Sequence, residues 1–200
     1  MNDMKLLIKG CEEKTYAIHY SCSGFYGGGA LAPTICCIAL TNLKTGELHS
    51  FSLHNYIIAG KCFMDAEKQL LTDFVNFFNS LENPIMAHWM MDGAAYGFKA
   101  ISARCENFGI YNLDLAKIQA FDLNIYSSYS LRPVLEKNNF SSVNILGGKD
   151  EALWFEKRNF NAVKLSTEAK SIGLAKSIGL AKLLNFYLKN DVEIDNDFID

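Results

Sequence analysis

The sequence predicts an α/β domain with a mixed sheet, in the order β-β-β-α-β-α followed by a mostly helical second half. Two patterns predict this class. Early in the chain, short β-branched and aromatic runs are typical of strands, whereas from about residue 65 apolar residues recur every three or four positions, as in an amphipathic helix. We expect one domain over residues 1–189, and an acidic tail over residues 190–200, which carry five carboxylates and no basic side chain.

Three strands are predicted near the start of the chain, over residues 15–22, 34–40 and 47–53. The first two are apolar or aromatic runs, and the third alternates polar and apolar side chains. The segment 42–46, Asn-Leu-Lys-Thr-Gly, is rich in turn-forming residues. This favours an antiparallel hairpin between the second and third strands.

A helix, a strand and a second helix are predicted next. The first helix has one broad apolar face and ends at Asn83-Pro84, and a strand over residues 84–88 follows it. A strand reached through a helix most naturally runs parallel to a strand of the same sheet. We expect Asp92 to cap the second helix, which Gly109 terminates, and we expect only helices from Asp114 onward.

This order of elements matches the ribonuclease H-like architecture, and one segment carries a closer resemblance. The run AEKQLLTDFVNFFNSLENPIMAHWMMD resembles the middle of the DEDD-type 3′–5′ exonuclease superfamily, where a helix with an early Glu and a leucine pair leads to a strand ending in Ala-His-Asn, and then to an Asp. YAIHYSCSG resembles the family's first strand, and GGKDEALWFEKRNFNAVKLSTEAKS falls where the family has its last motif helix, so the resemblance covers roughly residues 15–182. The matching residues of the middle segment are Glu67, Leu70, Leu71, Ala87, His88 and Asp92.

A second resemblance is to a branch of uncharacterised bacterial proteins, and it implies no activity. It is carried by His88-Trp89, Asp92, Tyr96-Gly97-Phe98 and Arg104.

The exonuclease resemblance implies a mechanism in which four carboxylates hold two Mg²⁺ or Mn²⁺ ions about 3.5–4 Å apart. Here His19 and Ser21 stand at the positions of the Asp-x-Glu pair on the first strand. Glu168 is the one carboxylate near the last motif, and its spacing does not match. Asp92 is the motif carboxylate that remains. One carboxylate cannot hold two ions, so we expect no catalytic residue, no metal and no cofactor.

The expected function is that of a catalytically degenerate exonuclease-like module, which binds a nucleic-acid or protein partner in a bacterial cytoplasm. Two alternatives stay open. One is an active metal-dependent 3′–5′ exonuclease with an altered site built from Asp92, Glu67 or Glu168 and His88, using Mg²⁺ or Mn²⁺. The other is a structural subunit that acts through a homo-oligomeric or heteromeric contact. The expected binding cleft consists of His19, Ser21, Phe25, Tyr26, His88, Trp89, Asp92 and Tyr96.

Composition excludes several classes of protein. The formal net charge of −3 excludes a heavily basic nucleic-acid binder. No charged residue lies between Lys14 and Lys44, but glycines and polar residues interrupt this stretch, so it is not a membrane span. The six cysteines show no metal-ligand spacing, and the start has no signal-peptide core, which indicates a reducing cytoplasm.

Three further features have competing interpretations. His19, Cys22, His54 and His88 could form a Cys-His pair or a zinc site, but histidines and cysteines at such positions are more often simply packed. Gly27–Gly29 could hold a phosphate or merely connect two strands. The sequence SIGLAK occurs at residues 171–176 and again at 177–182. In a helix the two copies differ by about 120°, so we interpret the repeat as a recent duplication.

Overall fold

The computed structural model describes residues 8, 10–24, 32–93, 96–126, 130–137, 139–140 and 145–179. These residues form an α/β fold with a five-stranded mixed sheet. The elements in chain order are η1 (Glu12–Lys14), β1 (Thr15–Cys22), β2 (Ile35–Asn42), β3 (Leu48–Ser52), α2 (Leu53–Ile58), α3 (Phe63–Ser80), β4 (Ile85–His88), α4 (Phe98–Asn107), η2 (Leu115–Lys117), β5 (Gln119–Asp122), η3 (Leu123–Tyr126), α5 (Leu131–Lys137), α6 (Gly148–Glu156) and α7 (Phe160–Gly179).

The sheet has the strand order β3-β2-β1-β4-β5. β2 is antiparallel to both β1 and β3, whereas β4 runs parallel to β1 and β5 runs parallel to β4. The predicted hairpin between β2 and β3, and the predicted parallel strand reached through α3, are therefore confirmed. The carboxyl ends of the parallel strands β1, β4 and β5 meet at one edge, where ligands bind in many α/β proteins.

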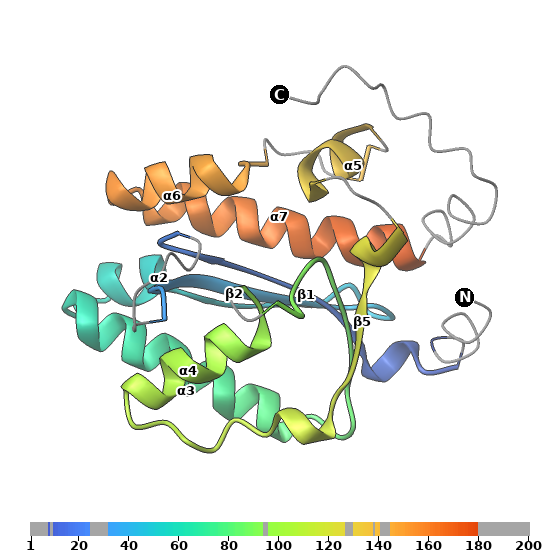
Figure 1. Ribbon diagram of the computed structural model, residues 1–200, viewed down its shortest axis with the longest axis horizontal. Coiled ribbons are helices and arrows are strands. Elements are labelled where there is room, and N and C mark those ends of the chain that lie inside the picture. Colours follow the sequence, from blue (N-terminus) through green and yellow to red (C-terminus); the bar gives the residue numbers. More distant parts are fainter. Residues whose placement is uncertain are drawn as a thin grey trace.

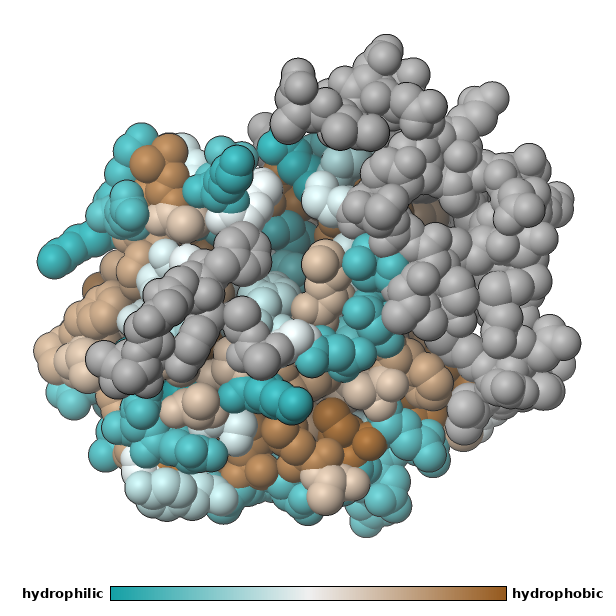
Figure 2. All heavy atoms as spheres, in the orientation of Figure 1, coloured by the Kyte–Doolittle hydropathy of each residue, from teal (hydrophilic) through white to brown (hydrophobic). Residues whose placement is uncertain are grey.

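Helices cover both faces of the sheet. α5, α6 and α7 lie along one face, and α3 and α4 cover the other (Figure 1). Side chains alternate along a strand, so each strand contributes to two separate interiors. On the face shown in Figure 2, hydrophilic and hydrophobic side chains are interspersed.

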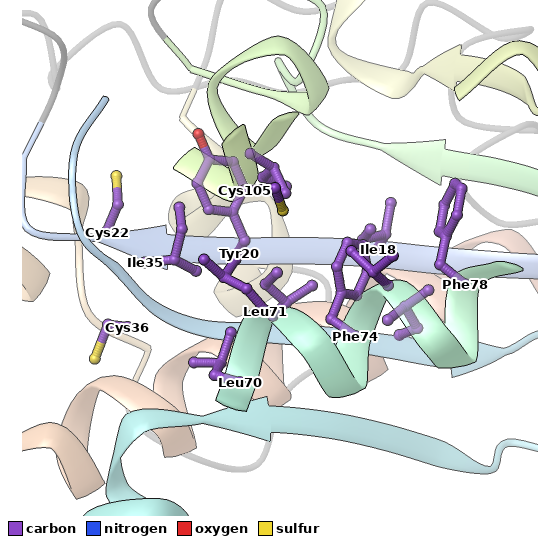
Figure 3. Close-up of a cluster of buried hydrophobic side chains, with 14 of the residues drawn as sticks. Ile18, Tyr20, Cys22, Ile35, Cys36, Leu70, Leu71, Phe74, Phe78 and Cys105 are labelled. Carbon is purple, nitrogen blue, oxygen red and sulfur yellow. The ribbon is translucent and has the colours of Figure 1, made fainter. Parts of the chain in front are cut away.

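The interior beneath α3 and α4 is strongly apolar. Ile18 and Tyr20 of β1 are fully buried there, and Figure 3 shows them above the apolar face of α3. Each large side chain buried in this way contributes about 1.5–3 kcal/mol relative to an exposed position. This cluster therefore supplies much of the driving force for folding. The predicted apolar face of α3 is confirmed by its buried members Leu70, Leu71, Phe74 and Phe78.

The interior beneath α7 is smaller and contains more polar groups. Ala17 of β1 and Ala87 of β4 contact an apolar cluster that includes Leu174 of α7. Buried hydroxyl groups and an ion pair lie beside this cluster, on the same face of the sheet. The two faces of the sheet thus differ in chemistry as well as in their helices.

The structure corrects three expectations. Residues 119–122 form the edge strand β5, where only helices were expected after Asp114. Leu53, expected at the end of the third strand, instead begins the short helix α2. Asp92 does not cap α4, because that helix begins at Phe98 with Gly97 as its N-cap, and Asp92 instead forms a β-bridge with Gly97. The acidic tail and the second half of the second SIGLAK copy lie outside the described residues. Among the helices that are described, none is long and apolar enough to cross a bilayer.

Candidate functional site

The residues expected to line one cleft lie on opposite faces of the sheet. Ala17 of β1 pairs in register with Ala87 of β4, and both contact the cluster beneath α7. His19 and Ser21 share the face of Ala17, whereas His88 lies on the opposite face, where its ring meets Phe98 of α4 edge-on. The hypothetical Cys-His or zinc pairing of His19 with His88 is therefore not assembled. Among the described residues, no group of three or more His, Cys, Asp or Glu side chains is placed to hold a metal.

His19 is a buried histidine. Within the described part of the chain, neither its Nδ1 nor its Nε2 has a hydrogen-bond partner. Burial lowers the pKa of His19 well below its ordinary value, and the positive charge of Lys170 lowers it further. The imidazole is consequently neutral at pH 7. It carries none of the negative charge that a hard divalent cation requires.

Ser21 forms a direct link between β1 and α7. Its Oγ lies 2.7 Å from Oγ1 of Thr167, and the hydroxyl of Thr167 donates a hydrogen bond to the backbone oxygen of Val163 at 2.8 Å. Because a hydroxyl has a single proton, Ser21 must be the donor to Thr167. The hydroxyl of Ser21 is therefore used within the protein, in a link that is fully buried.

A second hydroxyl pair repeats this arrangement one turn further along α7. Ser171 donates to the backbone oxygen of Ala17 at 2.8 Å, and Oγ1 of Thr41 lies 2.8 Å from Oγ of Ser171. By the same proton count, Thr41 is the donor to Ser171. Two hydroxyl pairs thus hold α7 against β1 and β2.

A buried ion pair completes the polar interior beneath α7. Nζ of Lys170 lies 2.8 Å from Oε1 of Glu151, and the same oxygen accepts a hydrogen bond from the hydroxyl of Ser166 at 2.8 Å. Burial raises the pKa of Glu151, and Lys170 opposes that rise. Ser166 in turn accepts the backbone N–H of Leu146. The Glu151 oxygen that these contacts use is committed to internal hydrogen bonds.

Glu168, the carboxylate that the sequence offered near the last motif, forms an ion pair with Lys164 at 2.9 Å. Where the resembled family places carboxylates on the first strand and the last helix, this protein has His19, Ser21 and a helix that presents Thr167. Neutral imidazole and hydroxyl groups in this arrangement can join a helix to a sheet. They cannot bind two hard divalent cations.

On the opposite face, His88 lies between two carboxylates at the carboxyl ends of β4 and β5. Its Nδ1 accepts the backbone N–H of Met91 at 3.2 Å, so the proton of the neutral ring is on Nε2. Nε2 lies 3.2 Å from Oδ1 of Asp92, and Oδ1 of Asp122 lies 3.8 Å from Nδ1. Burial lowers the pKa of His88, and the two carboxylates oppose this effect. Asp122 was not predicted, because β5 was not.

The segment after β4 has a constrained backbone. Met90 has a left-handed φ of 58°, and its N–H donates to Oδ1 of Asp122 at 2.9 Å. Gly97 has a φ of 135°, and a Cβ there would lie 1.7 Å from the backbone oxygen of Met91. The N–H of Gly97 also donates to the phenolic oxygen of Tyr20 at 2.8 Å. This geometry leaves Met90 53% exposed and the side chain of Asp92 63% exposed.

Tyr20 and Tyr96 fix this segment to the sheet. Their rings stack with centroids 4.4 Å apart, and the hydroxyl of Tyr96 donates to the backbone oxygen of Tyr20 at 2.7 Å. Tyr96, a predicted cleft residue, is therefore hydrogen-bonded to β1. Trp89 is also a predicted cleft residue, and it is buried in the cluster beneath α7. Phe25, Tyr26 and Gly27–Gly29 lie outside the described residues.

Glu67 is a buried carboxylate with a structural role. It accepts two bonds from Arg104, from Nε at 2.7 Å and from Nη2 at 2.6 Å, and it accepts the backbone N–H of Ile35 at 2.8 Å. Arg104 also donates to Thr34 and to the backbone oxygen of Ala32. Glu67 thus joins α3, α4 and the start of β2. Its oxygens are occupied by these partners.

Sequence reasoning missed several residues that determine this chemistry. Ser166 and Thr167 are adjacent hydroxyl residues inside a helix, where such residues usually face solvent. Their presence is visible in the sequence, but the partners are not. Thr167 and Ser171 each contact a residue more than a hundred positions away. Lys170 and Glu151 are 19 residues apart, on different helices, so their pairing also depends on how the helices pack.

A scan against protein-family models and a search of curated proteins both returned no match for this chain.

Proposed function

We propose that this chain is a ribonuclease H-like domain of the DEDD exonuclease type that has lost metal-dependent hydrolysis and acts by binding a protein partner. The strand order β3-β2-β1-β4-β5, with β2 antiparallel to its neighbours and β4 and β5 parallel to β1, supports this architecture. The resemblance of the segment from Glu67 to Asp92 supports the exonuclease type.

The contact between Ser21 and Thr167 carries the proposal. In the resembled family the first strand and the last helix supply carboxylates to a shared pair of metal ions. Here these elements meet through a buried hydroxyl pair 2.7 Å long, next to the neutral His19. Two hydroxyl groups can hydrogen-bond to each other without a cation, and the bond holds the helix against the strand. A set of carboxylates needs cations between them to offset their mutual repulsion.

The surface at the end of β4 favours a protein over a nucleic acid. Asp92 is exposed, and Asp122 lies beside His88. Met90, which lies between His88 and Asp92 in the chain, is also exposed. A phosphate backbone approaching this edge would meet two carboxylates, which repel it. Exposed methionine is instead enriched where proteins contact one another. This edge is also where α/β sheets commonly bind their ligands.

Site-specific photo-crosslinking tests the proposal. A benzophenone-bearing amino acid introduced at Met90 should yield a covalent adduct with one discrete protein in bacterial cells. The same group at Tyr111, which is 78% exposed, is the matched control and should not yield that adduct. A nucleic-acid adduct from Met90, or identical adducts from both positions, would contradict the proposed partner class.

A further inference from the structure

The outer edge of β3 is an unpaired edge of the sheet. β3 pairs with β2 on one side, in a register that sets Thr41 opposite Leu48 and Ala39 opposite Ser50. The N–H of Asn42 donates to the backbone oxygen of Glu47, so the backbone hydrogen-bonding groups of Glu47 point toward β2. Backbone groups alternate in direction along a strand. Leu48 and Ser50 therefore direct their N–H and C=O groups away from β2, toward the open side.

These outward groups have no partner within the described part of the chain, and the strand has few features that block pairing. Leu48 and Ser50 are half-buried, and the strand sequence Leu-His-Ser-Phe-Ser has no Lys, Arg or Pro. Natural edge strands usually carry such residues, or bulges, to prevent pairing with another chain. Bulges and shifts in register are absent from the described pairing of β3 with β2. The edge is thus suited to accept another strand.

We propose that β3 pairs antiparallel with β3 of a second copy of this chain, about a two-fold axis at Leu48. This proposal is independent of the proposed function. In this register Leu48 exchanges both backbone hydrogen bonds with its counterpart, as an isologous contact requires. Glu47 lies directly opposite His49 of the second copy, and His49 lies opposite Glu47 of the second copy.

Hydrogen-bond complementarity between Glu47 and His49 selects a second copy as the occupant. Within one chain, Nε2 of His49 is 3.7 Å from Oε1 of Glu47, and both side chains are on the α3 side of the sheet. The two-fold axis places two such pairs side by side, so that carboxylates and imidazoles alternate around a ring of four groups. A carboxylate that faces an imidazole across antiparallel strands can accept its N–H, and such complementary cross-strand pairs stabilise the pairing. A register centred on His49 would instead place Glu47 opposite Phe51.

A proline at the edge tests the backbone contact. Ser50→Pro removes an outward N–H and places the proline ring where the second strand would lie, whereas the bonds to β2 are kept. Sedimentation velocity over a wide range of concentration should show a monomer–dimer equilibrium for the parent and for Ser50→Ala. Ser50→Pro should remain monomeric with an unchanged circular dichroism spectrum. A parent that is monomeric throughout, or a Ser50→Pro variant that still dimerises, overturns the proposal.

A charge reversal tests the register without touching the backbone. Glu47→Lys sets a cation opposite His49 of the second copy, and should raise the dimer dissociation constant by about tenfold, equivalent to ~1.4 kcal/mol. Glu82→Lys makes the same change of charge at an exposed position outside β3 and serves as the control. Equal effects of the two variants would show that net charge, and not this register, governs association.

Discussion

At the scale of single residues, the pair formed by Glu67 and Arg104 predicts a large loss of stability on mutation. Glu67→Leu leaves the guanidinium of Arg104 without its carboxylate partner and the N–H of Ile35 without its acceptor, in a buried environment. Breaking one side of such a pair costs about 3–5 kcal/mol. Chemical denaturation should show this loss. Glu156→Leu, on the surface end of α6, is the control and should change stability by less than about 1 kcal/mol. Equal losses of stability in the two variants would show that the contacts of Glu67 do not stabilise the fold.

Gly97 provides a second residue-scale prediction. Gly97→Ala should destabilise the protein by several kcal/mol, because its Cβ would overlap the backbone oxygen of Met91, where no side-chain rotation can relieve the contact. Gly109→Ala is a matched control with a left-handed φ of 74° and open space around its Cβ. The control should cost only about 1 kcal/mol. Thermal unfolding of both variants measures the difference, and similar melting temperatures would contradict the account.

Asp92 shows why single-residue roles are hard to predict from sequence. An aspartate just before an amphipathic pattern usually caps the helix. Here Asp92 instead forms a β-bridge with Gly97, and α4 starts only at Phe98. Gly97 is held by Tyr20, which is more than seventy residues away and accepts a hydrogen bond from the N–H of Gly97. A local pattern contains no information about such a partner.

At the scale of elements, the hydroxyl pair between β1 and α7 predicts a strongly non-additive double mutant. Thr167→Val leaves the donor of Ser21 unpaired and buried, which costs about 1–3 kcal/mol. Ser21→Ala together with Thr167→Val removes both groups and should cost less than Thr167→Val alone. Denaturant unfolding of the full cycle measures the coupling. Additive effects would show that the two hydroxyls do not interact.

The SIGLAK repeat allows a test of α7 by deletion. Removing residues 177–182 leaves residues 160–176 unchanged, including Gly173, which packs against Leu135, and brings Leu183 and Leu184 to the next two positions. The position of Ile178 is buried, and leucine suits it. We expect the variant to be soluble and at least as stable as the parent. A melting temperature several degrees lower, or aggregation, would show that both copies are needed in the core.

The strands and helices with strong periodicity were predicted correctly, and the weak ones were missed. The apolar face of α3 and the hairpin of β2 and β3 follow from local patterns. β5 has four residues, two of them exposed, so its sequence Gln-Ala-Phe-Asp has too short a pattern to identify a strand. Its place at the sheet edge depends on β4, and thus on tertiary structure.

At the scale of the whole molecule, buried histidines predict a loss of stability at acidic pH. The pKa of His19 is lowered in the folded state, whereas an unfolded histidine titrates near about 6.5. The unfolded state therefore binds more protons as the pH falls below about 6.5, and stability decreases through this range. Of the charged groups facing His19, Lys170 strengthens this effect, whereas the raised pKa of Glu151 opposes it.

Urea unfolding at about pH 7.5 and about pH 5.5 measures this dependence. His19→Met replaces the ring with a neutral side chain that needs no hydrogen bond. Its stability should decrease less between the two pH values than that of the parent. His88 also has a lowered pKa, so part of the dependence should remain in the variant. An identical change in parent and variant would contradict the neutral state of His19.

The order of elements predicts much of the sheet, but the chemistry of the site depends on contacts between distant segments. His19 and Ser21 were identified as the positions without carboxylates from their place in the first strand. Their partners on α7 could not be found, because the contacts of a helical residue with other elements depend on how the helix packs against the sheet. Lys170 and Glu151 are therefore visible only in the folded chain.

The most direct test of the central claim is a nuclease assay on 5′-labelled single- and double-stranded DNA and RNA, with Mg²⁺ and with Mn²⁺. The account predicts no release of 3′ nucleotides above the level of a mock purification. The assay should give the same result for the parent and for Asp92→Ala. Progressive 3′ shortening that the parent performs and Asp92→Ala does not would contradict the account, because it would show that Asp92 supports metal-dependent catalysis despite the hydroxyl pair of Ser21 and Thr167.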